Sequence, residues 1–353
     1  MKNVSIQDGV ERLSRLRKIV IEHPRLGHIR DKIRWLLLET SSVVRDNEAR
    51  REAARNRPYK CEELWVLPIV GPSGAMKSTS LRKIIEEINA DETYPPDDIP
   101  VLFVSLREVK NTRSFLKEIL EQYGDAGKDF VPKSGPIDTQ IVARAIYNAA
   151  RAKRTLLLIV DEAHELLRYD GGKTRHSMAM LLKTMVNEGV FSIVLVGTDD
   201  LRPLFRSKEL INRTVSDEEV TLRPFDIKKE ADRRYFFKFL QRVEDEMVSA
   251  GIVDEPLGWV ATLEDRAKIF DMCEGVPGVA CRVLRIALER ALRNGRTSIE
   301  WRDFESAFRA FNANLERPLP DPFAEGPQKA TLGRLKAAAD AEAKSKRGSK
   351  EPA

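Results

Sequence analysis

The spacing of apolar residues divides the chain near residue 226. Before this point, short unbroken apolar runs alternate with stretches whose apolar residues recur at helical spacing. The runs predict strands at residues 64–70, 99–106, 156–160, 191–197 and 219–222. The stretches between them predict helices at about 78–88, 113–123, 138–152, 175–188 and 200–205. This alternation is typical of a parallel, doubly wound α/β sheet with right-handed crossovers.

The flanking parts of the chain carry only helical patterns. Residues 10–57 predict a helical extension, interrupted at 23–25, that ends in a charged linker. Residues 227–316 predict a small helical domain, with helices at about 228–249, 263–273, 279–294 and 299–315. From residue 317 to 353 bulky apolar side chains nearly vanish, so burial cannot offset the entropy of ordering. We therefore expect four parts: residues 1–57, the core at 58–226, the helical domain at 227–316 and a mobile basic tail at 317–353.

Composition adds few constraints. Lys and Arg number 60 against 55 Asp and Glu, a net charge of +5. This mild basic excess permits a nucleic-acid partner without requiring one. The three cysteines form no C-x-x-C pair, so neither a disulfide framework nor a structural zinc site is indicated. The polar N-terminus and the lack of an apolar run of about 18 residues predict a soluble, cytoplasmic protein.

A glycine-rich segment stands between the first predicted strand and the first helix of the core. It fits the phosphate-binding pattern G-x-x-x-x-G-K-[ST], except that Met76 replaces the second glycine. We expect backbone N–H groups here to surround the β-phosphate of ATP, Lys77 to reach the β- and γ-phosphates, and Ser78 to bind Mg²⁺. The alternative is an unrelated turn before a helix. The predicted nucleotide-binding residues are Gly71, Pro72, Ser73, Gly74, Ala75, Met76, Lys77, Ser78 and Thr79.

Two acidic residues follow the apolar strand at 156–160. At the end of a central parallel strand, Asp161 would hold Mg²⁺, and Glu162 would orient and deprotonate the attacking water. The alternative is that both acids merely begin the next helix and stabilise its dipole. His164 follows closely, and we interpret it as a surface or packing residue.

The assembled parts resemble an AAA+ ATPase, with a P-loop α/β core, a C-terminal all-α lid and an N-terminal helical extension. Within that class, the chain is most similar to the TniB/TnsC-type ATP-binding proteins of transposition systems. Three segments carry this finer resemblance: residues 21–25, residues 195–198 with the acidic pair after them, and residues 274–278.

The resemblance implies further catalytic residues. Thr198 would be a polar sensor near the γ-phosphate, the alternative being an ordinary strand-end turn residue. Arg213 would be an arginine finger that enters a neighbouring subunit, the alternative being a surface ion pair. Gly278 occupies the place of a nucleotide-sensing lid arginine, so that sensor is absent or displaced to Arg282.

The resemblance also implies a function. It describes a bacterial, DNA-associated protein that uses ATP and Mg²⁺, forms a ring or helical filament on double-stranded DNA, marks the target and recruits a transposase. A target-selection protein is a further implied partner. Phosphate contacts by Arg107, Lys110 and Arg113 would make binding independent of sequence, although a solvated loop explains these charges equally well. The alternatives are a helicase-loader-like or origin-recognition-like AAA+ ATPase, and a nucleotide-binding adaptor with little hydrolysis.

Overall fold

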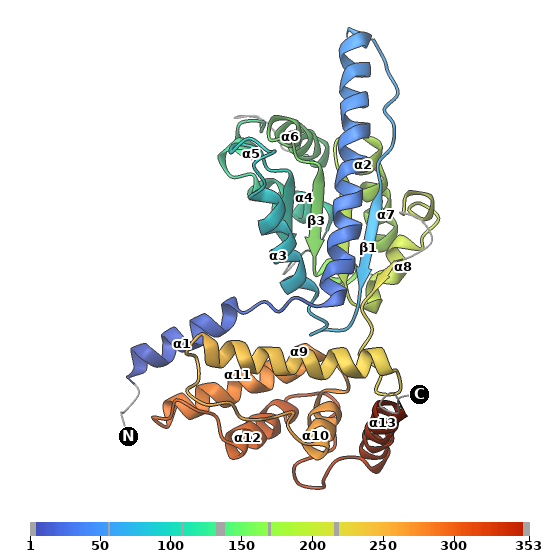
Figure 1. Cartoon of the computed structure of the whole chain (residues 1–353). Helices are drawn as coiled ribbons and strands as arrows, with labels where there is room; N and C mark the ends of the chain where they lie inside the picture. The colour runs from blue at the N-terminus through green and yellow to red at the C-terminus, as the bar shows by residue number, and fades with distance from the viewer. Residues whose placement is uncertain are drawn as a thin grey trace. The chain divides into compact units, whose positions relative to one another are not determined.

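The computed structural model describes residues 5–55, 57–106, 109, 111–131, 138–168, 171–214 and 219–348. Their contacts divide the chain into two compact units (Figure 1). The core unit comprises Pro24–Ser73 and Lys77–Leu222. The helical unit comprises Met1–His23, Gly74–Met76 and Arg223–Ala353. Each unit has a hydrophobic core of its own.

The core unit is built on a parallel sheet. Its strands are β1 (Val66–Val70), β2 (Val101–Ser105), β3 (Leu157–Asp161), β4 (Ser192–Gly197) and β5 (Val220–Thr221). They lie in the order β2-β3-β4-β1-β5, and every recorded pairing is parallel. All residues of β1, β3 and β4 are buried, which explains why their sequences are apolar without alternation. The predicted doubly wound sheet is confirmed.

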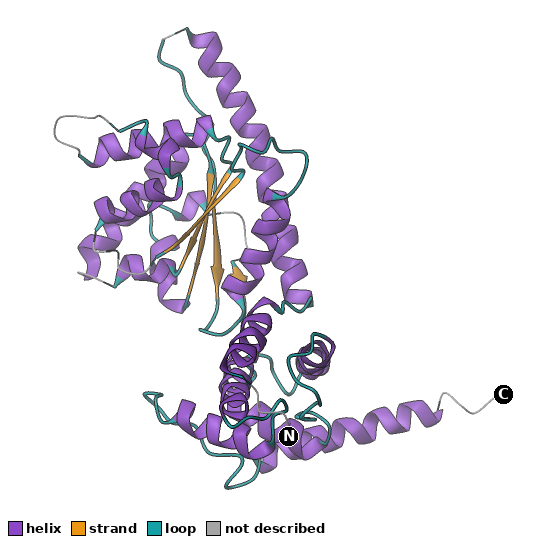
Figure 2. Cartoon of the chain, turned by 90° about the vertical axis from the view of Figure 1, so that its left-hand side faces the viewer, coloured by secondary structure: helices purple, strands orange, loops and turns teal. Residues whose placement is uncertain are grey.

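Helices cover both faces of this sheet (Figure 2). On one side α2 packs with α3, and on the other α4 packs with α6 and α7. Short helices complete the connections. The core helices are α2 (Pro24–Ala54), α3 (Lys77–Asn89), α4 (Thr112–Gln122), α5 (Asp125–Lys128), α6 (Thr139–Ala152), α7 (Gly171–Asn187) and α8 (Arg202–Phe205), with 3₁₀ turns η1 (Ala163–Leu167), η2 (Asp199–Leu201) and η3 (Ile211–Arg213).

Helix α2 corrects part of the sequence prediction. It continues through the region expected to be a charged linker and ends at Ala54. Polar contacts fix it to the core. Arg30 donates to both carboxylate oxygens of Glu87 on α3, at 2.9 and 3.0 Å, and the buried Thr40 hydroxyl lies 2.7 Å from that of Ser192. The predicted N-terminal extension therefore is not one part, because α2 belongs to the core unit.

In the described part of the helical unit, α1 (Ile6–Lys18) is followed by five further helices. Arg12 of α1 donates to the carbonyl oxygen of Ile252 at 3.0 Å. Trp259 and Phe304 pack edge to face in the core of this unit, 5.8 Å between ring centroids. The other helices are α9 (Glu230–Ser249), α10 (Leu263–Cys273), α11 (Pro277–Arg293), α12 (Trp301–Asn312) and α13 (Lys329–Gly348). Among the helices described, none combines the length and apolar character that a membrane crossing requires.

Helix α13 differs from the mobile tail expected at residues 317–353. Asp271 on α10 accepts hydrogen bonds from the Gln328 amide and the Thr331 hydroxyl, both at 2.7 Å. Leu335 is buried one turn further along α13. The low apolar content of this segment led to the wrong expectation, because a few well-placed contacts are enough to dock an alanine-rich helix.

Candidate nucleotide-binding site

The predicted phosphate loop follows β1, at the edge where the carboxyl ends of the parallel strands meet. Its first residue is held by the sheet, since the Gly71 amide donates to the Gly197 carbonyl at 3.1 Å. A β-carbon on Gly71 would lie 2.6 Å from the Leu222 carbonyl oxygen, which is closer than real contacts allow. Only glycine fits here. Helix α3 then begins at Lys77, as the pattern requires.

Met76 has a left-handed backbone, a conformation that glycine adopts more readily than other residues. Its φ is +65°, and φ of Gly74 is +81°. The left-handed region costs a residue with a side chain about 1–2 kcal/mol. The departure from the sequence pattern therefore introduces strain without removing the turn that precedes Lys77.

Lys77 lies at the centre of this arrangement. The residue is 7% exposed, and Nζ donates to the carbonyl oxygens of Gly71 at 2.6 Å and Pro72 at 2.9 Å. Burial lowers the pKa of Lys77, while the carboxylates of Glu162, Asp161 and Asp199 act in the opposite direction. The lysine and three carboxylates from the ends of β3 and β4 are thus close enough to interact.

The two acids at the end of β3 have different environments. Asp161 is 2% exposed, and its Oδ1 accepts the Glu162 amide at 3.0 Å. Glu162 has a left-handed backbone, with φ +55° and ψ 35°, and its side chain is 46% exposed. Glu162 precedes η1 but makes no side-chain capping bond, so a helix cap does not account for it. An exposed carboxylate beside a buried one suits a base and a metal ligand, respectively.

The residues after β4 extend the site. Thr198 follows the strand, and its hydroxyl donates to Asp200 Oδ2 at 3.2 Å. Asp199 forms an ion pair with Arg202 at 3.0 Å, and its negative charge acts to raise the pKa of Lys77. Sequence reasoning noted the acidic pair after Thr198 but gave Asp199 no role. Its position directly after a central strand was the available signal.

Arg213 has partners within its own unit. It lies at the end of η3, where Nε donates to Asn187 Oδ1 at 3.1 Å and Nη2 pairs with Glu63. Its side chain is 19% exposed. A role as an arginine finger therefore requires this ion pair to open. In the helical unit, the Arg282 guanidinium lies over the Phe311 ring, 5.6 Å from its centroid.

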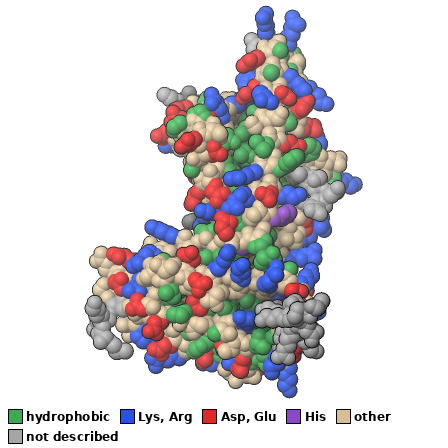
Figure 3. All heavy atoms as spheres, in the orientation of Figure 1, with side chains coloured by type: hydrophobic (Ala, Val, Ile, Leu, Met, Phe, Trp, Pro, Cys, Tyr) green, Lys and Arg blue, Asp and Glu red, His purple; other side chains and the backbone are tan. Residues whose placement is uncertain are grey.

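The predicted DNA-contacting loop is described only in part. Arg107 and Lys110 lie outside the described residues. Arg113 is in the first turn of α4, which Asn111 and Ser114 cap reciprocally. On the face drawn in Figure 3, basic and acidic side chains are interspersed. Arg113 as a DNA contact stays a prediction.

Magnesium places modest demands on the protein. Protein sites for Mg²⁺ beside nucleotides use one or two carboxylates, with phosphate oxygens and water completing the shell. Ser78 in the first turn of α3 and the buried Asp161 would supply a hydroxyl and a carboxylate oxygen, which fit a magnesium ion bound together with ATP. Among the described residues, no three His, Cys, Asp or Glu side chains are grouped so that they could hold a metal ion by themselves.

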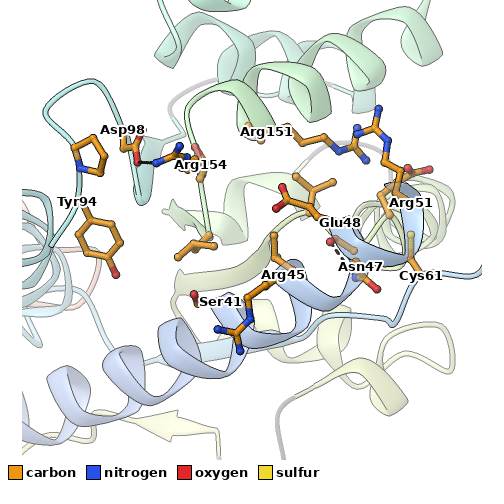
Figure 4. Close-up of a pocket in the computed structure, with 18 of the residues that line it drawn as sticks. Ser41, Arg45, Asn47, Glu48, Arg51, Cys61, Tyr94, Asp98, Arg151 and Arg154 are labelled. Carbon is orange, nitrogen blue, oxygen red and sulfur yellow. Dashed lines mark hydrogen bonds and ion pairs between the residues drawn. The ribbon is translucent and has the colours of Figure 1, made fainter. Parts of the chain in front are cut away.

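The core unit also has a cavity of about 300 Å³ (Figure 4), and none of residues 71–79 lines it. Its lining includes residues that precede β3 and β4, so it lies at the amino ends of the strands. Arg154 pairs there with Asp98 at 3.3 Å, and the Arg51 and Arg151 side chains point toward one another (Figure 4). Its location separates it from the nucleotide site.

Comparisons with known proteins agree with this architecture. Residues 66–205 match a family model described as "AAA domain". The chain is 23% identical over 251 residues to the ORC1-type DNA replication protein 2 of Thermoplasma acidophilum. The aligned residues cover 70% of this chain and 57% of that protein. It is 20% identical over 316 residues to the ORC1-type DNA replication protein of Pyrococcus abyssi, covering 82% and 71%. The chain thus spans little more than half of the first relative.

Solved structures show the same fold. The Aeropyrum pernix ORC2 protein, solved as ADPNP–ADP complexes, has a TM-score of 0.50 at 17% identity, covering 79% of this chain and 68% of that one. The Aeropyrum pernix ORC1 protein in complex with DNA has a TM-score of 0.50 at 14% identity, covering 85% and 69%. The core is therefore an AAA+ P-loop fold with helical N-terminal and C-terminal regions.

Proposed function

We propose that this chain binds Mg²⁺–ATP at residues 71–79 and hydrolyses it. One observation carries the proposal: the buried Lys77 and the carboxylates of Asp161, Glu162 and Asp199 gather beside a glycine-rich turn at the carboxyl edge of a parallel sheet. A buried cation there suits phosphate, and carboxylates suit a metal ion and an activated water. The AAA+ fold supports the same conclusion.

Each residue has a role in this proposal. Loop amides and Lys77 bind the phosphates, and Ser78 and Asp161 hold Mg²⁺. The bound ion neutralises charge on the phosphates. Glu162, whose carboxylate is accessible, orients the attacking water and accepts its proton. Thr198, directly after β4, senses the γ-phosphate.

Two substitutions separate binding from hydrolysis. Glu162→Gln should abolish phosphate release while a fluorescent ATP analogue still binds. Lys77→Ala should weaken binding of that analogue. Lys83→Ala is the matched control, because Lys83 is on the same helix with a 40% exposed side chain. Phosphate release that persists in Glu162→Gln would contradict the assigned base, and little release by the intact chain would favour the nucleotide-binding adaptor.

The proposal extends to assembly on double-stranded DNA. The chain carries a net charge of +5, and it shares its fold with a protein solved in complex with DNA. We propose that ATP occupancy favours a ring or filament of identical subunits, with Arg113 and its neighbours on the DNA phosphates. Lys110→Ala/Arg113→Ala should weaken duplex binding and reduce its salt dependence. An unchanged salt slope would remove these residues from the interface.

Two biological roles remain in this proposal. The motifs at residues 21–25, 195–198 and 274–278 favour a transposition regulator that marks target DNA for a transposase. The two ORC1-type relatives favour an initiator or helicase-loading role. Electron microscopy with duplex DNA and a non-hydrolysable ATP analogue distinguishes them. Extended DNA-coating filaments support the transposition role, whereas discrete rings that need a helicase partner support the other.

A further inference from the structure

His164 is the second residue of η1, and its ring lies beside the proposed catalytic carboxylate. Its Nδ1 atom is 3.4 Å from Glu162 Oε2, and its side chain is 23% exposed. A β-carbon on Gly197 would lie 3.2 Å from the His164 amide nitrogen and 3.3 Å from Nδ1. The Nδ1 edge of the ring therefore approaches both the Glu162 carboxylate and the last residue of β4.

This nitrogen is buried without a hydrogen bond in the described structure. Buried polar atoms without partners are rare, and each one calls for an explanation. The 3.4 Å separation from Glu162 exceeds the usual N–H···O range of about 2.7–3.2 Å by only a few tenths of an ångström. Because the terminal torsion of a glutamate rotates over a broad range, a small rotation of this half-exposed carboxylate would complete the bond.

The other ring nitrogen of His164, Nε2, lies farther from its nearest carboxylate than Nδ1 does from Glu162. Nε2 of His164 is 3.9 Å from Glu165 Oε1. Arg168 already donates to both carboxylate oxygens of Glu165, at 3.2 Å each. The contact that distinguishes this histidine is therefore the one between Nδ1 and Glu162.

We propose that His164 is a positioning residue for Glu162. The ring donates its Nδ1–H to Glu162 Oε2 and fixes the orientation of the carboxylate that receives the proton from water; His164 takes no part in the proton transfer itself. The inference rests on the proposed ATP hydrolysis. Because the ring also lies close to Gly197, which precedes Thr198, it links the orientation of Glu162 to the end of β4.

Three substitutions test which nitrogen matters. His164→Asn places an amide nitrogen near the position of Nδ1, His164→Gln places one near Nε2, and His164→Ala supplies neither. We expect the Ala and Gln variants to lose roughly tenfold in kcat, as is usual when a supporting hydrogen bond is removed. The Asn variant should keep at least about half of the kcat on the same reasoning. KM for ATP and the affinity for the fluorescent analogue should stay unchanged in all three.

His176→Ala is the matched control. His176 on α7 also has its Nδ1 near a carboxylate, 3.1 Å from Glu209, but its side chain is 65% exposed and lies outside the predicted site residues. This variant should retain full kcat. A wild-type kcat in His164→Ala would overturn the proposal, as would equal losses in the Asn and Ala variants, which indicate packing alone.

The Asn and Gln variants also cover the case in which His164→Ala fails to fold. Since both carry the same amide group, a difference in kcat between them reports on the position of the nitrogen. Hydrolysis that survives Glu162→Gln would overturn the role of Glu162 as the base, and this inference with it. Hydrolysis that depends on Glu162 but is equal in the Asn and Gln variants would overturn this inference alone.

Discussion

Arg213 provides the most discriminating prediction, because its observed contacts and its predicted catalytic role have different consequences. It pairs with Glu63 and donates to Asn187. A hydrogen bond to a charged group contributes about 1.5–3 kcal/mol when buried. The Glu63 side chain is 40% exposed, so solvent screening reduces the contribution of the Arg213–Glu63 ion pair to stability to under about 1 kcal/mol. We expect Arg213→Ala to destabilise the core unit by about 1–2 kcal/mol.

Thermal denaturation measures this loss. For a domain of 150–250 residues, 1 kcal/mol corresponds to about 2–4 °C, so the melting temperature should fall by about 2–8 °C. A double-mutant cycle with Glu63→Ala should show a coupling of about 0.5–1 kcal/mol. Unchanged stability in Arg213→Ala, or strictly additive effects in the cycle, would refute the structural reasoning.

The catalytic role adds a separate expectation. An arginine finger contributes about 10³–10⁵ in kcat. If Arg213 acts in this way, Arg213→Ala should lose hydrolysis on that scale, whereas Glu63→Gln should lose stability but keep hydrolysis. Equal hydrolysis in the two variants would assign Arg213 to the ion pair with Glu63 alone.

Three further predictions follow from individual contacts. At a concentration 100 times the Kd, ATP should stabilise the wild-type chain by about 2.7 kcal/mol, and Lys77→Ala should lose this stabilisation in calorimetry; an equal gain in the variant would contradict the site. Thr331→Val should cost about 1–3 kcal/mol, because it removes a hydrogen bond to the buried Asp271, and hydrogen exchange at Gln328 should accelerate. Burial raises the pKa of Asp303, but hydrogen bonds from Arg296 and a backbone amide outweigh it and lower the pKa below its usual value. The stability from Asp303 should thus be present above about pH 4 and lost as the pH falls through the folded-state pKa; Asp303→Asn should flatten this acid dependence, and an unchanged dependence would contradict the assignment.

Much of the fold was predictable because its strands are buried on both faces. Such strands must be apolar throughout, so β1, β3 and β4 stand out in the sequence with boundaries within two residues of those observed. The positions of Lys77 and Asp161 follow from the same logic, since the carboxyl ends of neighbouring parallel strands share one edge. These elements predict the doubly wound sheet, and their resemblance to AAA+ ATPases predicts the AAA+ fold.

The remaining features depend on contacts between distant residues. The chain that precedes Ala54 looks like a linker because its charges are dense, yet Asn47 hydrogen-bonds the carbonyl oxygens of Glu62 and Gly189 and secures this helix. Helix α13 depends in the same way on its hydrogen bonds to the buried Asp271 and on the burial of Leu335. His164 has no sequence signature, because its proximity to Gly197 arises only when β3 and β4 pair. Local sequence patterns do not predict such contacts between distant residues.

Gly71 joins the first turn of the phosphate loop to the parallel sheet. Its amide donates to the Gly197 carbonyl, and the Leu222 carbonyl leaves no room for a β-carbon on it, so the ends of β1, β4 and β5 meet at this residue. The loop consequently has no independent shape that survives when those strands separate. Loss of nucleotide binding should therefore accompany loss of the sheet. In a urea titration, nucleotide binding and the circular-dichroism signal of the strands should disappear at the same midpoint.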